Sequence, residues 1–463
     1  MELFLTLLGF YLSPLLLILG LIIIPACFGV SIGLRKIYKT FLLQLFEFGR
    51  QRIALEDKKR NHDGQDEEQE GQLQPLHSYT LSRERGGSGR HIAEGVKNQT
   101  SALSSKNGID QVRREFELSD GLYFCKKGME AIIDDEVTKR FSAEELPSWN
   151  LLTRTNMNYQ YLSMRLTILW IIGFIIRYFI LLPIRLSVTV FALTYLLSST
   201  ALLGCMPDSN LKKVLNKYVS LTVYRILCRC FSAMITYHDR ENRAVGGGIC
   251  VANHTSPIDV LVLASDNCYA FIGQSHGGLF GVIQRALSRS GTDHIWFERF
   301  EIQDRRGVTQ RLKEHVEDSR KLPMLIFPEG TCINNTSVMM FKKGSFDVGG
   351  VIYPAAVKYD SRFGDAFWNS SRFSGVQYLM MMMTSWAVVA DVWYLPPMYR
   401  QEEEEAATFA NRVKAEIAKK GGLVDLVWDG QLKRVRVKSE LIREEQLEYS
   451  KIIASAKAEM KED

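Results

Sequence analysis

His254 and Asp259 lie five residues apart, and their types suggest acid–base chemistry. They belong to the segment Asn253-His254-Thr255-Ser256-Pro257-Ile258-Asp259, which directly follows the apolar run Ile249-Cys250-Val251-Ala252. The run predicts a strand, and Ser256 and Pro257 predict a helix that begins between the two side chains. On one continuous helix the two side chains would point about 140° apart. With a turn between them, Asp259 can reach back to the imidazole and orient it as a general base.

This motif contains no nucleophile, so we expect the substrate to supply the hydroxyl group that His254 activates. Two simpler interpretations remain open. Asp259 is also a suitable capping-box acid for the helix, and His254 alone is compatible with an ordinary loop histidine. The position of the pair at a strand end, together with a second motif at another strand end, favours the catalytic interpretation.

The second motif is Pro328-Glu329-Gly330-Thr331, which follows the predicted strand Leu325-Ile326-Phe327. Ligands of open α/β sheets bind beyond the carboxyl ends of the strands. Gly330 permits a turn or a close backbone approach, and Thr331 with its neighbouring amides can donate to a phosphate or an oxyanion. Glu329 would repel a phosphate, so we expect it to orient a cation or a substrate hydroxyl. An ordinary strand-to-loop turn is the alternative.

Two basic residues are candidates for binding phosphate groups. Arg299 follows the predicted strand His294-Ile295-Trp296-Phe297, and its guanidinium can bind a phosphate through two parallel hydrogen bonds. Lys343 lies in Phe341-Lys342-Lys343-Gly344. The alternatives are a surface salt bridge for Arg299 and a solvated charged turn for Lys343.

Apolar runs alternate with amphipathic stretches between about residue 215 and residue 400, which predicts an α/β domain with a central sheet. The predicted strands are 249–252, 269–273, 294–297, 324–327, 351–358 and 389–394. The predicted helices are 257–265, 278–289, 307–319 and 405–420. The net charge of +5 is mild, and no basic stripe with interleaved aromatics indicates a nucleic-acid partner. The eight cysteines show no metal-ligand spacing.

Taken as an ordered set, these blocks resemble the glycerolipid (PlsC-type) acyltransferases. The set comprises His254 with Asp259, Arg299 after an aromatic strand, Phe327 to Thr331, and Pro354 within Val351-Ile352-Tyr353-Pro354-Ala355-Ala356. The resemblance covers about residues 215–430. Further stretches are similar to the endoplasmic-reticulum glycerol-3-phosphate acyltransferases of animals: Phe341 to Phe346, Phe363 to Trp368 and Leu395 to Met398.

The resemblance implies a central mixed sheet flanked by helices, an N-terminal membrane helix and a hydrophobic helical hairpin. It also implies acyl-CoA as the donor and sn-glycerol 3-phosphate as the acceptor, acylated at its sn-1 hydroxyl to give lysophosphatidic acid for phospholipid and triacylglycerol synthesis. His254 would be the base and Asp259 its orienting acid. Substrate binding would involve Arg299, Glu329, Gly330, Thr331, Lys343 and Pro354. We expect direct transfer with no covalent acyl-enzyme, no metal and no cofactor beyond the co-substrate acyl-CoA.

One position departs from the family pattern. Many members carry arginine after the Glu-Gly-Thr triplet, and here Cys332 stands in that place. Phosphate binding would then depend more heavily on Arg299 and Lys343. Because Cys332 adjoins the predicted site, we expect reagents that alkylate thiols to inhibit the enzyme.

Three other functions remain to be distinguished. A lysophosphatidic acid acyltransferase shares all four blocks. Gly273-Gln274-Ser275-His276-Gly277 matches the nucleophile elbow of serine hydrolases, with Asp293 and His315 as candidate partners for Ser275. A membrane scaffold that keeps an idle catalytic fold is the third, and the intact His254–Asp259 pair argues against it.

The rest of the chain predicts a membrane protein. Residues 3–34 carry no charge and exceed the ~20 residues that span a bilayer. A signal peptide is the alternative, but the run is long and no Lys or Arg precedes it. Residues 166–205 form a second apolar block with a turn expected at Pro183-Ile184-Arg185, which indicates a two-helix hairpin or a re-entrant element lying in the interface. Arg177 within this block is costly unless it pairs or reaches the interface.

These observations predict six regions. They are an N-terminal membrane anchor (1–40), a disordered cytosolic linker (41–110), a helical membrane-proximal region (111–163), the hydrophobic hairpin or pair of membrane helices (164–206), the catalytic domain (207–430) and a charged helical tail (431–463). Arg35, Lys36 and Lys39 follow the anchor, and the positive-inside rule therefore orients the linker to the cytosol. We expect a multi-pass protein of the endoplasmic reticulum membrane, in contact with membrane lipid, whose catalytic domain faces the cytosol. The oligomeric state is left open.

Overall fold

The computed structural model describes residues 16–30, 33–70, 122–124, 139–144, 146, 150–152, 163–275, 277–297 and 302–430. The chain divides into two units, residues 1–58 with 137–433 and residues 59–136 with 434–463. The first unit contains the sheet, the helices that cover it and both sequence motifs. The tail over 431–463, residues 71–110 of the expected linker and most of the expected region 111–163 lie outside the described residues.

A seven-stranded mixed sheet forms the centre of the first unit, in the order β1-β8-β7-β2-β5-β3-β4. Its strands are β1 (Met234–His238), β2 (Ile249–Ala252), β3 (Ala270–Gln274), β4 (Ile295–Phe297), β5 (Met324–Ile326), β7 (Ile352–Tyr359) and β8 (Val389–Tyr394). The five strands from β7 to β4 are parallel to one another, whereas β8 is antiparallel to β7 and parallel to β1. The predicted mixed sheet is therefore confirmed, with β1 as a strand that the sequence patterns did not indicate. A separate parallel pair joins β6 (Ser337–Val338) to β9 (Val424–Asp425).

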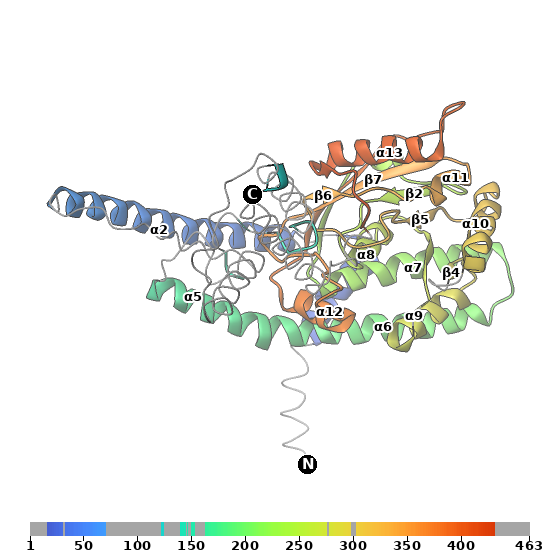
Figure 1. The fold of residues 1–463 in the computed structure, drawn as a ribbon. Coiled ribbons are helices and arrows are strands. Elements are labelled where there is room, and N and C mark those ends of the chain that lie inside the picture. The colour runs from blue at the N-terminus through green and yellow to red at the C-terminus, as the bar shows by residue number, and fades with distance from the viewer. Residues whose placement is uncertain are drawn as a thin grey trace, which may run out of the picture. The chain divides into compact units, whose positions relative to one another are not determined.

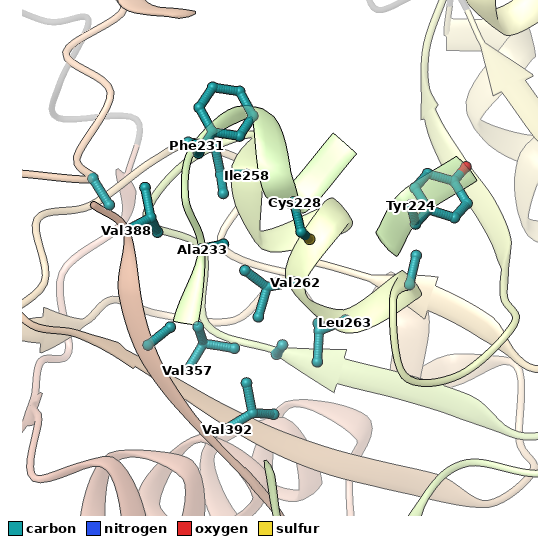
Figure 2. Packing of buried hydrophobic residues seen from close by; sticks show 14 of the residues in the cluster. Tyr224, Cys228, Phe231, Ala233, Ile258, Val262, Leu263, Val357, Val388 and Val392 are labelled. Carbon is teal, nitrogen blue, oxygen red and sulfur yellow. The ribbon is translucent and has the colours of Figure 1, made fainter. Parts of the chain in front are cut away.

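Helices cover both faces of this sheet, as Figure 1 shows for α13 on one side and α7 on the other. On one face, α7 (Asn210–Cys230) and α8 (Ile258–Ala264) pack against the strands. Figure 2 shows part of this core, where side chains such as Val262 and Leu263 of α8 lie against Val357 and Val392 of the sheet. On the other face, α10 (Ile302–Glu317) and α13 (Ala406–Gly421) bury apolar side chains against β2 and β5. Three further helices are α9 (Gly278–Arg289), α11 (Gly344–Asp347) and α12 (Gly375–Thr384).

The expected hairpin over 164–206 is wrong, because the structure has one continuous helical run, Met164–Gly204, with no turn at Pro183. The run comprises α5 (Met164–Ile175), the π-helical segment η1 (Ile176–Leu181) and α6 (Leu182–Gly204). Proline lacks an amide hydrogen and clashes with the carbonyl four residues earlier. Pro183 is the second residue after the wider π segment, and local π-helical adjustments relieve that conflict within a helix. By length and composition this run is able to cross a membrane, and Leu16–Cys27 is a shorter apolar helix.

One side of this long helix is bound to the catalytic unit by arginine. Arg185 is 2% exposed, and its guanidinium donates to the carbonyl oxygens of Met383 and Ser385, both at 2.6 Å, and of Trp386 at 2.7 Å. It also bonds the Ser232 hydroxyl at 2.8 Å. Arg185 therefore satisfies carbonyl groups of the last turn of α12 and of the segment that follows it. These bonds explain why an arginine is buried in this mostly apolar helix.

A helix also replaces the first part of the expected disordered linker. Helix α2 covers Leu34–Glu70, whereas a linker was expected from residue 41. Leu42, Phe46 and Ile53 are at most 5% exposed and pack with Leu166 of α5 and with Phe363. These three side chains recur at helical spacing, and their burial explains why the segment is ordered.

Candidate active site

The structure brings His254 and Asp259 together in the way that the sequence predicted. Imidazole Nδ1 lies 2.9 Å from Asp259 Oδ2, and the Asp259 side chain is fully buried while that of His254 is 18% exposed. Helix α8 begins at Ile258, so a turn separates the two residues. The Ser256 hydroxyl accepts a hydrogen bond from the Ile258 amide at 3.2 Å within this turn.

Further donors surround the Asp259 carboxylate. Its Oδ2 accepts from the amides of Thr255 at 2.7 Å and Ser256 at 2.9 Å. Its Oδ1 accepts from the hydroxyl of Tyr359, which stands at the end of β7, 100 residues away. These bonds fix the orientation of the carboxylate. Tyr359 is a site residue that the motif analysis missed, because its sequence neighbourhood looks like any buried strand.

Two asparagines position Tyr359 by extending the hydrogen bonding of β7 beyond the end of β2. The Asn253 side chain donates to the Val357 carbonyl at 2.9 Å and accepts from the Val357 amide at 2.8 Å. Asn335 makes the same pair of bonds with the backbone of Tyr359, at 2.6 and 2.8 Å. Side-chain amides thus take the place of a neighbouring strand. The Asn253 that precedes His254 is therefore part of the framework of the site.

Glu329 joins the two sequence motifs, although not in the role that we expected. Its carboxylate accepts from the His254 amide at 2.8 Å and from the Met339 amide at 3.0 Å. Both carboxylate oxygens are thus bonded to backbone amides, and only 1% of the residue is exposed. Glu329 therefore holds the loop that carries His254 and does not face a substrate. Burial raises the pKa of Glu329 to about 8, although its two amide donors and His254 act in the opposite direction.

The second motif also contacts the backbone and ring of His254. The Ile333 amide donates to the His254 carbonyl at 2.9 Å, and the Phe327 ring stacks on the imidazole with centroids 4.3 Å apart. Asp259 occupies Nδ1, so Nε2 is the nitrogen that can take a proton. Burial alone lowers the pKa of His254, but Cys332 and Asp259 outweigh it and hold that pKa well above 6.5. Cys332 itself is 5% exposed, and inhibition by alkylation stays a prediction.

Basic and turn residues lie next to these groups at the second motif. Gly330 is exposed and has φ +66°, as its predicted turn requires. A Cβ atom at Gly330 would lie 3.1 Å from Lys342 Nζ, so this ammonium group covers the turn. Lys343, the lysine that we expected here, is the N-cap residue of α11, and its carbonyl accepts from the amides of Phe346 and Asp347 within that helix. Lys342 is therefore the lysine that the structure places beside the motif, and Thr331 is half-buried next to it.

The structure does not bring every predicted residue to this edge of the sheet. Pro354 is buried inside β7, level with Val251, where its carbonyl accepts from the Leu395 amide at 2.9 Å. Its position indicates a role in the sheet rather than in substrate binding. Arg299 lies outside the described residues.

The two residues considered as partners for Ser275 in a hydrolase have contacts with other groups. His315 is 2% exposed and its Nε2 lies 2.8 Å from the Leu322 carbonyl, while Asp293 is 3.5 Å from Lys321. Neither contact is with Ser275, whose amide donates to the Phe297 carbonyl. Among the described residues, no group of three or more His, Cys, Asp or Glu side chains is placed to bind a metal ion.

Comparisons with known proteins agree with this geometry. Residues 234–358 match the family model described as "Acyltransferase". The chain is 54% identical to "Glycerol-3-phosphate acyltransferase 4" of Homo sapiens over 453 residues, which are 98% of this chain and 96% of the relative. It is 52% identical to "Glycerol-3-phosphate acyltransferase 3" of Homo sapiens over 439 residues, 95% of each chain. The chain belongs to the PlsC-type acyltransferase family.

As a member of this family, the protein is an enzyme, and its acyltransferase domain spans both the His254 and the Glu329 motifs. The solved structures include the "1-acyl-sn-glycerophosphate (LPA) acyltransferase, PlsC" of Thermotoga maritima. That structure is 16% identical, covers 53% of this acyltransferase and 96% of its own chain, and gives a TM-score of 0.39.

Proposed function

We propose that this acyltransferase transfers the acyl group of acyl-CoA to the sn-1 hydroxyl of sn-glycerol 3-phosphate, giving lysophosphatidic acid and free coenzyme A. The observation that carries the proposal is the His254–Asp259 pair, bonded at 2.9 Å at the carboxyl end of β2. The near full-length similarity to proteins named glycerol-3-phosphate acyltransferases supports the choice of acceptor.

In the proposed mechanism, His254 Nε2 takes the proton of the sn-1 hydroxyl as its oxygen attacks the thioester carbonyl. Asp259 keeps the ring in position and stabilises its charged form. The tetrahedral intermediate then expels the coenzyme A thiolate, and the imidazolium returns the proton to that sulfur. The reaction balances with the two substrates alone, so the mechanism uses no acyl-enzyme and no further cofactor.

We propose that the phosphate of the acceptor binds beside the second motif. Gly330, Thr331 and the ammonium group of Lys342 supply donors and positive charge there. Arg299 and Lys343 remain candidates from the sequence. The exposed position of Gly330, next to a lysine, supports this location.

The test is an assay of purified membranes with labelled acyl-CoA, in which sn-glycerol 3-phosphate and lysophosphatidic acid are offered separately. We expect label in lysophosphatidic acid with the first acceptor, loss of turnover in His254→Ala and retained turnover in Ser275→Ala. Acylation of lysophosphatidic acid alone would assign the enzyme to the alternative acceptor. Full activity of His254→Ala would contradict the mechanism.

We propose that the protein associates with the endoplasmic reticulum membrane, with its active site facing the cytosol. The run Met164–Gly204 is about 60 Å long at 1.5 Å per residue, roughly twice the ~30 Å hydrocarbon core. It exposes large apolar side chains, including Phe179, Val190 and Leu202, whereas Arg185 is buried. These features support a helix that lies in the membrane interface. The multi-pass arrangement stays a prediction.

A further inference from the structure

Three arginines outside the active site have no acidic partner among the residues that the structure describes. Arg35 lies at the start of α2, and Arg225 and Arg229 lie one turn apart on α7, where residues four apart share a face. All three are half-buried. Arg35 Nη1 donates to the Ala233 carbonyl at 2.9 Å, and Arg225 Nε donates to the Ser265 carbonyl at 3.1 Å. Within the described part of the chain, no carboxylate forms an ion pair with any of them.

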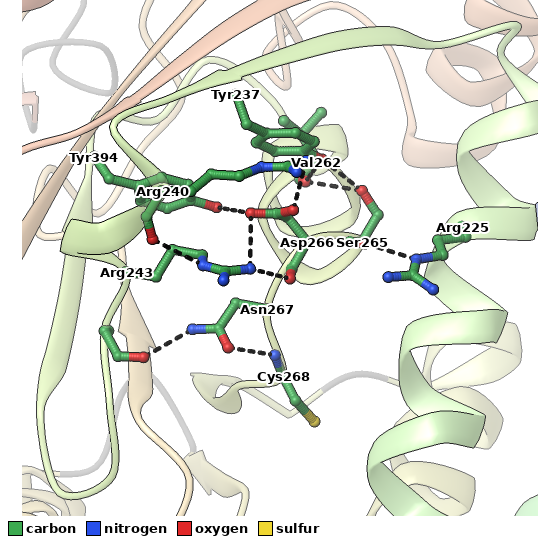
Figure 3. A network of polar contacts seen from close by, with 11 residues as sticks. Arg225, Tyr237, Arg240, Arg243, Val262, Ser265, Asp266, Asn267, Cys268 and Tyr394 are labelled. Carbon is green, nitrogen blue, oxygen red and sulfur yellow. Dashed lines mark hydrogen bonds and ion pairs between the residues drawn. The ribbon is translucent and has the colours of Figure 1, made fainter. Parts of the chain in front are cut away.

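Two neighbouring arginines show the contrast. Arg240 and Arg243 both pair with the buried Asp266, at 2.9 and 3.5 Å. Figure 3 shows this network, with Arg225 at its margin, bonded to Ser265 through Nε while its two terminal nitrogens lie outside the network. Asp266 is thus engaged by other residues, and the positive charge of Arg225 is not balanced there.

The unbalanced charges act on one another. Burial lowers the pKa of Arg229 to about 10, and the charges of Arg35 and Arg225 act in the same direction. Arginine guanidinium groups keep their charge at neutral pH. Like charges in a half-buried site repel each other strongly, and a bound anion would remove that repulsion.

The surroundings indicate what kind of anion fits. A Cβ atom at Gly29 would lie 3.0 Å from Arg225 Nη1, so the turn after helix Leu16–Cys27 packs against this arginine. The neighbours of Gly29 in that turn, Phe28 and Val30, are 76% and 55% exposed. On α7, Tyr218 precedes Arg225 by two turns and is also exposed. A soluble phosphate makes no use of such apolar surface, whereas a lipid does.

We propose that Arg35, Arg225 and Arg229 bind the phosphate group of an anionic lipid, whose acyl chains lie along the exposed apolar side chains beside them. Guanidinium groups bind phosphate oxygens through paired hydrogen bonds. A phosphate monoester carries about −1.5 to −2 charges and therefore matches three arginines better than a diester. Ser265 follows the last residue of α8 and Asp259 lies in its first turn, so this site is separate from the active site.

The experiment measures flotation of the full-length protein, purified in neutral detergent, with phosphatidylcholine vesicles that contain or lack phosphatidic acid. Each arginine near an anionic lipid surface contributes to the binding free energy. The double variant Arg225→Gln/Arg229→Gln loses two such contributions and should bind phosphatidic acid vesicles about 30-fold more weakly. Binding to pure phosphatidylcholine should not change. The matched control, Arg311→Gln/Lys313→Gln, removes the same charge from exposed positions of α10. An equal loss in the control would mean nonspecific attraction and would overturn the proposal.

Soluble competitors identify the source of the phosphate. Binding to phosphatidic acid vesicles should survive an excess of inorganic phosphate or sn-glycerol 3-phosphate, and displacement by either would assign the arginines to a soluble ligand instead. Melting temperatures report whether the variants fold. Should the double variant fail to fold, Arg229→Gln alone should show a smaller loss in the same direction, and unchanged binding would contradict the proposal. No acyl-CoA is present, so the outcome does not depend on the proposed catalytic function.

Discussion

Asp259 depends on a donor that comes from far along the chain, the hydroxyl of Tyr359. In Tyr359→Phe, one buried carboxylate oxygen loses its hydrogen bond, which should cost about 1.5–3 kcal/mol of stability. Without the Tyr359 hydroxyl, the negative charge of the Asp259 carboxylate is stabilised by fewer donors. It therefore attracts the His254 proton more strongly and raises the His254 pKa further. A general base acts in its neutral form, so activity falls as the pH falls through this pKa. We expect the acidic limb of the kcat/KM profile to move to higher pH.

Tyr394→Phe is the matched control. Tyr394 is 1% exposed and its hydroxyl donates to Asp266 at 3.3 Å, so this variant also removes a bond to a carboxylate. It should lower the melting temperature and leave the pH profile unchanged. An unmoved acidic limb in Tyr359→Phe would show that Tyr359 only supports the fold.

A variant of Glu329 can distinguish whether this residue positions the His254 loop or binds substrate. In Glu329→Gln, one side-chain oxygen becomes an amino group that faces a backbone amide, so the His254 loop loses a hydrogen bond. We expect kcat to fall at least about tenfold, because a buried amide left without its acceptor costs about 1–3 kcal/mol, with little change in the KM for either substrate. Steady-state kinetics measure both constants. A large rise in the acceptor KM with kcat preserved would instead support the substrate-binding role that the sequence suggested.

The same carboxyl predicts how stability depends on pH. The pKa of Glu329 rises from 4.5 to about 8 in the folded protein because the group is buried. Between these values the folded state retains a proton that the unfolded state has lost, so stability falls as the pH rises through this window. Thermal unfolding at several pH values should show a shallower decline in Glu329→Gln than in the parent protein. Parallel declines would indicate that Glu329 is ionised throughout.

At the scale of the elements, Arg185 connects the long apolar helix to the catalytic unit. Its guanidinium is the donor to three carbonyl groups, and a shorter neutral side chain would leave these acceptors buried without partners. Arg185→Gln should therefore destabilise the protein by about 3 kcal/mol or more. Arg165→Gln, at an exposed position of the same helix, should have little effect. Equal melting temperatures of the two variants would contradict this account.

The elements also show what the sequence was able to predict. Strands β2, β5 and β8 were found nearly to the residue, because buried apolar runs between turn residues carry a local signal. The His254–Asp259 contact was found for the same reason. The continuous helix through Pro183 was not predicted, because it depends on a π segment and on the carbonyl partners of Arg185. The bond from Tyr359 to Asp259 and the bond from the His254 amide to Glu329 join segments 75 or more residues apart, and no local pattern reports such contacts.

At the scale of the whole molecule, the exposed apolar side of Met164–Gly204 should determine membrane attachment. Phe179 and Val190 are 71% and 65% exposed and lie three helical turns apart, on the same side. An acidic side chain costs about 2.5–3.5 kcal/mol in the hydrocarbon region and less near its boundary. Phe179→Glu/Val190→Glu should therefore weaken flotation with phosphatidylcholine vesicles at least about tenfold, while the melting temperature in detergent stays the same. Tyr399→Glu introduces a charge at another exposed position, outside this helix, and should not affect flotation. If the double variant floats like the parent protein, this side of the helix does not enter the bilayer, and attachment must rest on the N-terminal segment.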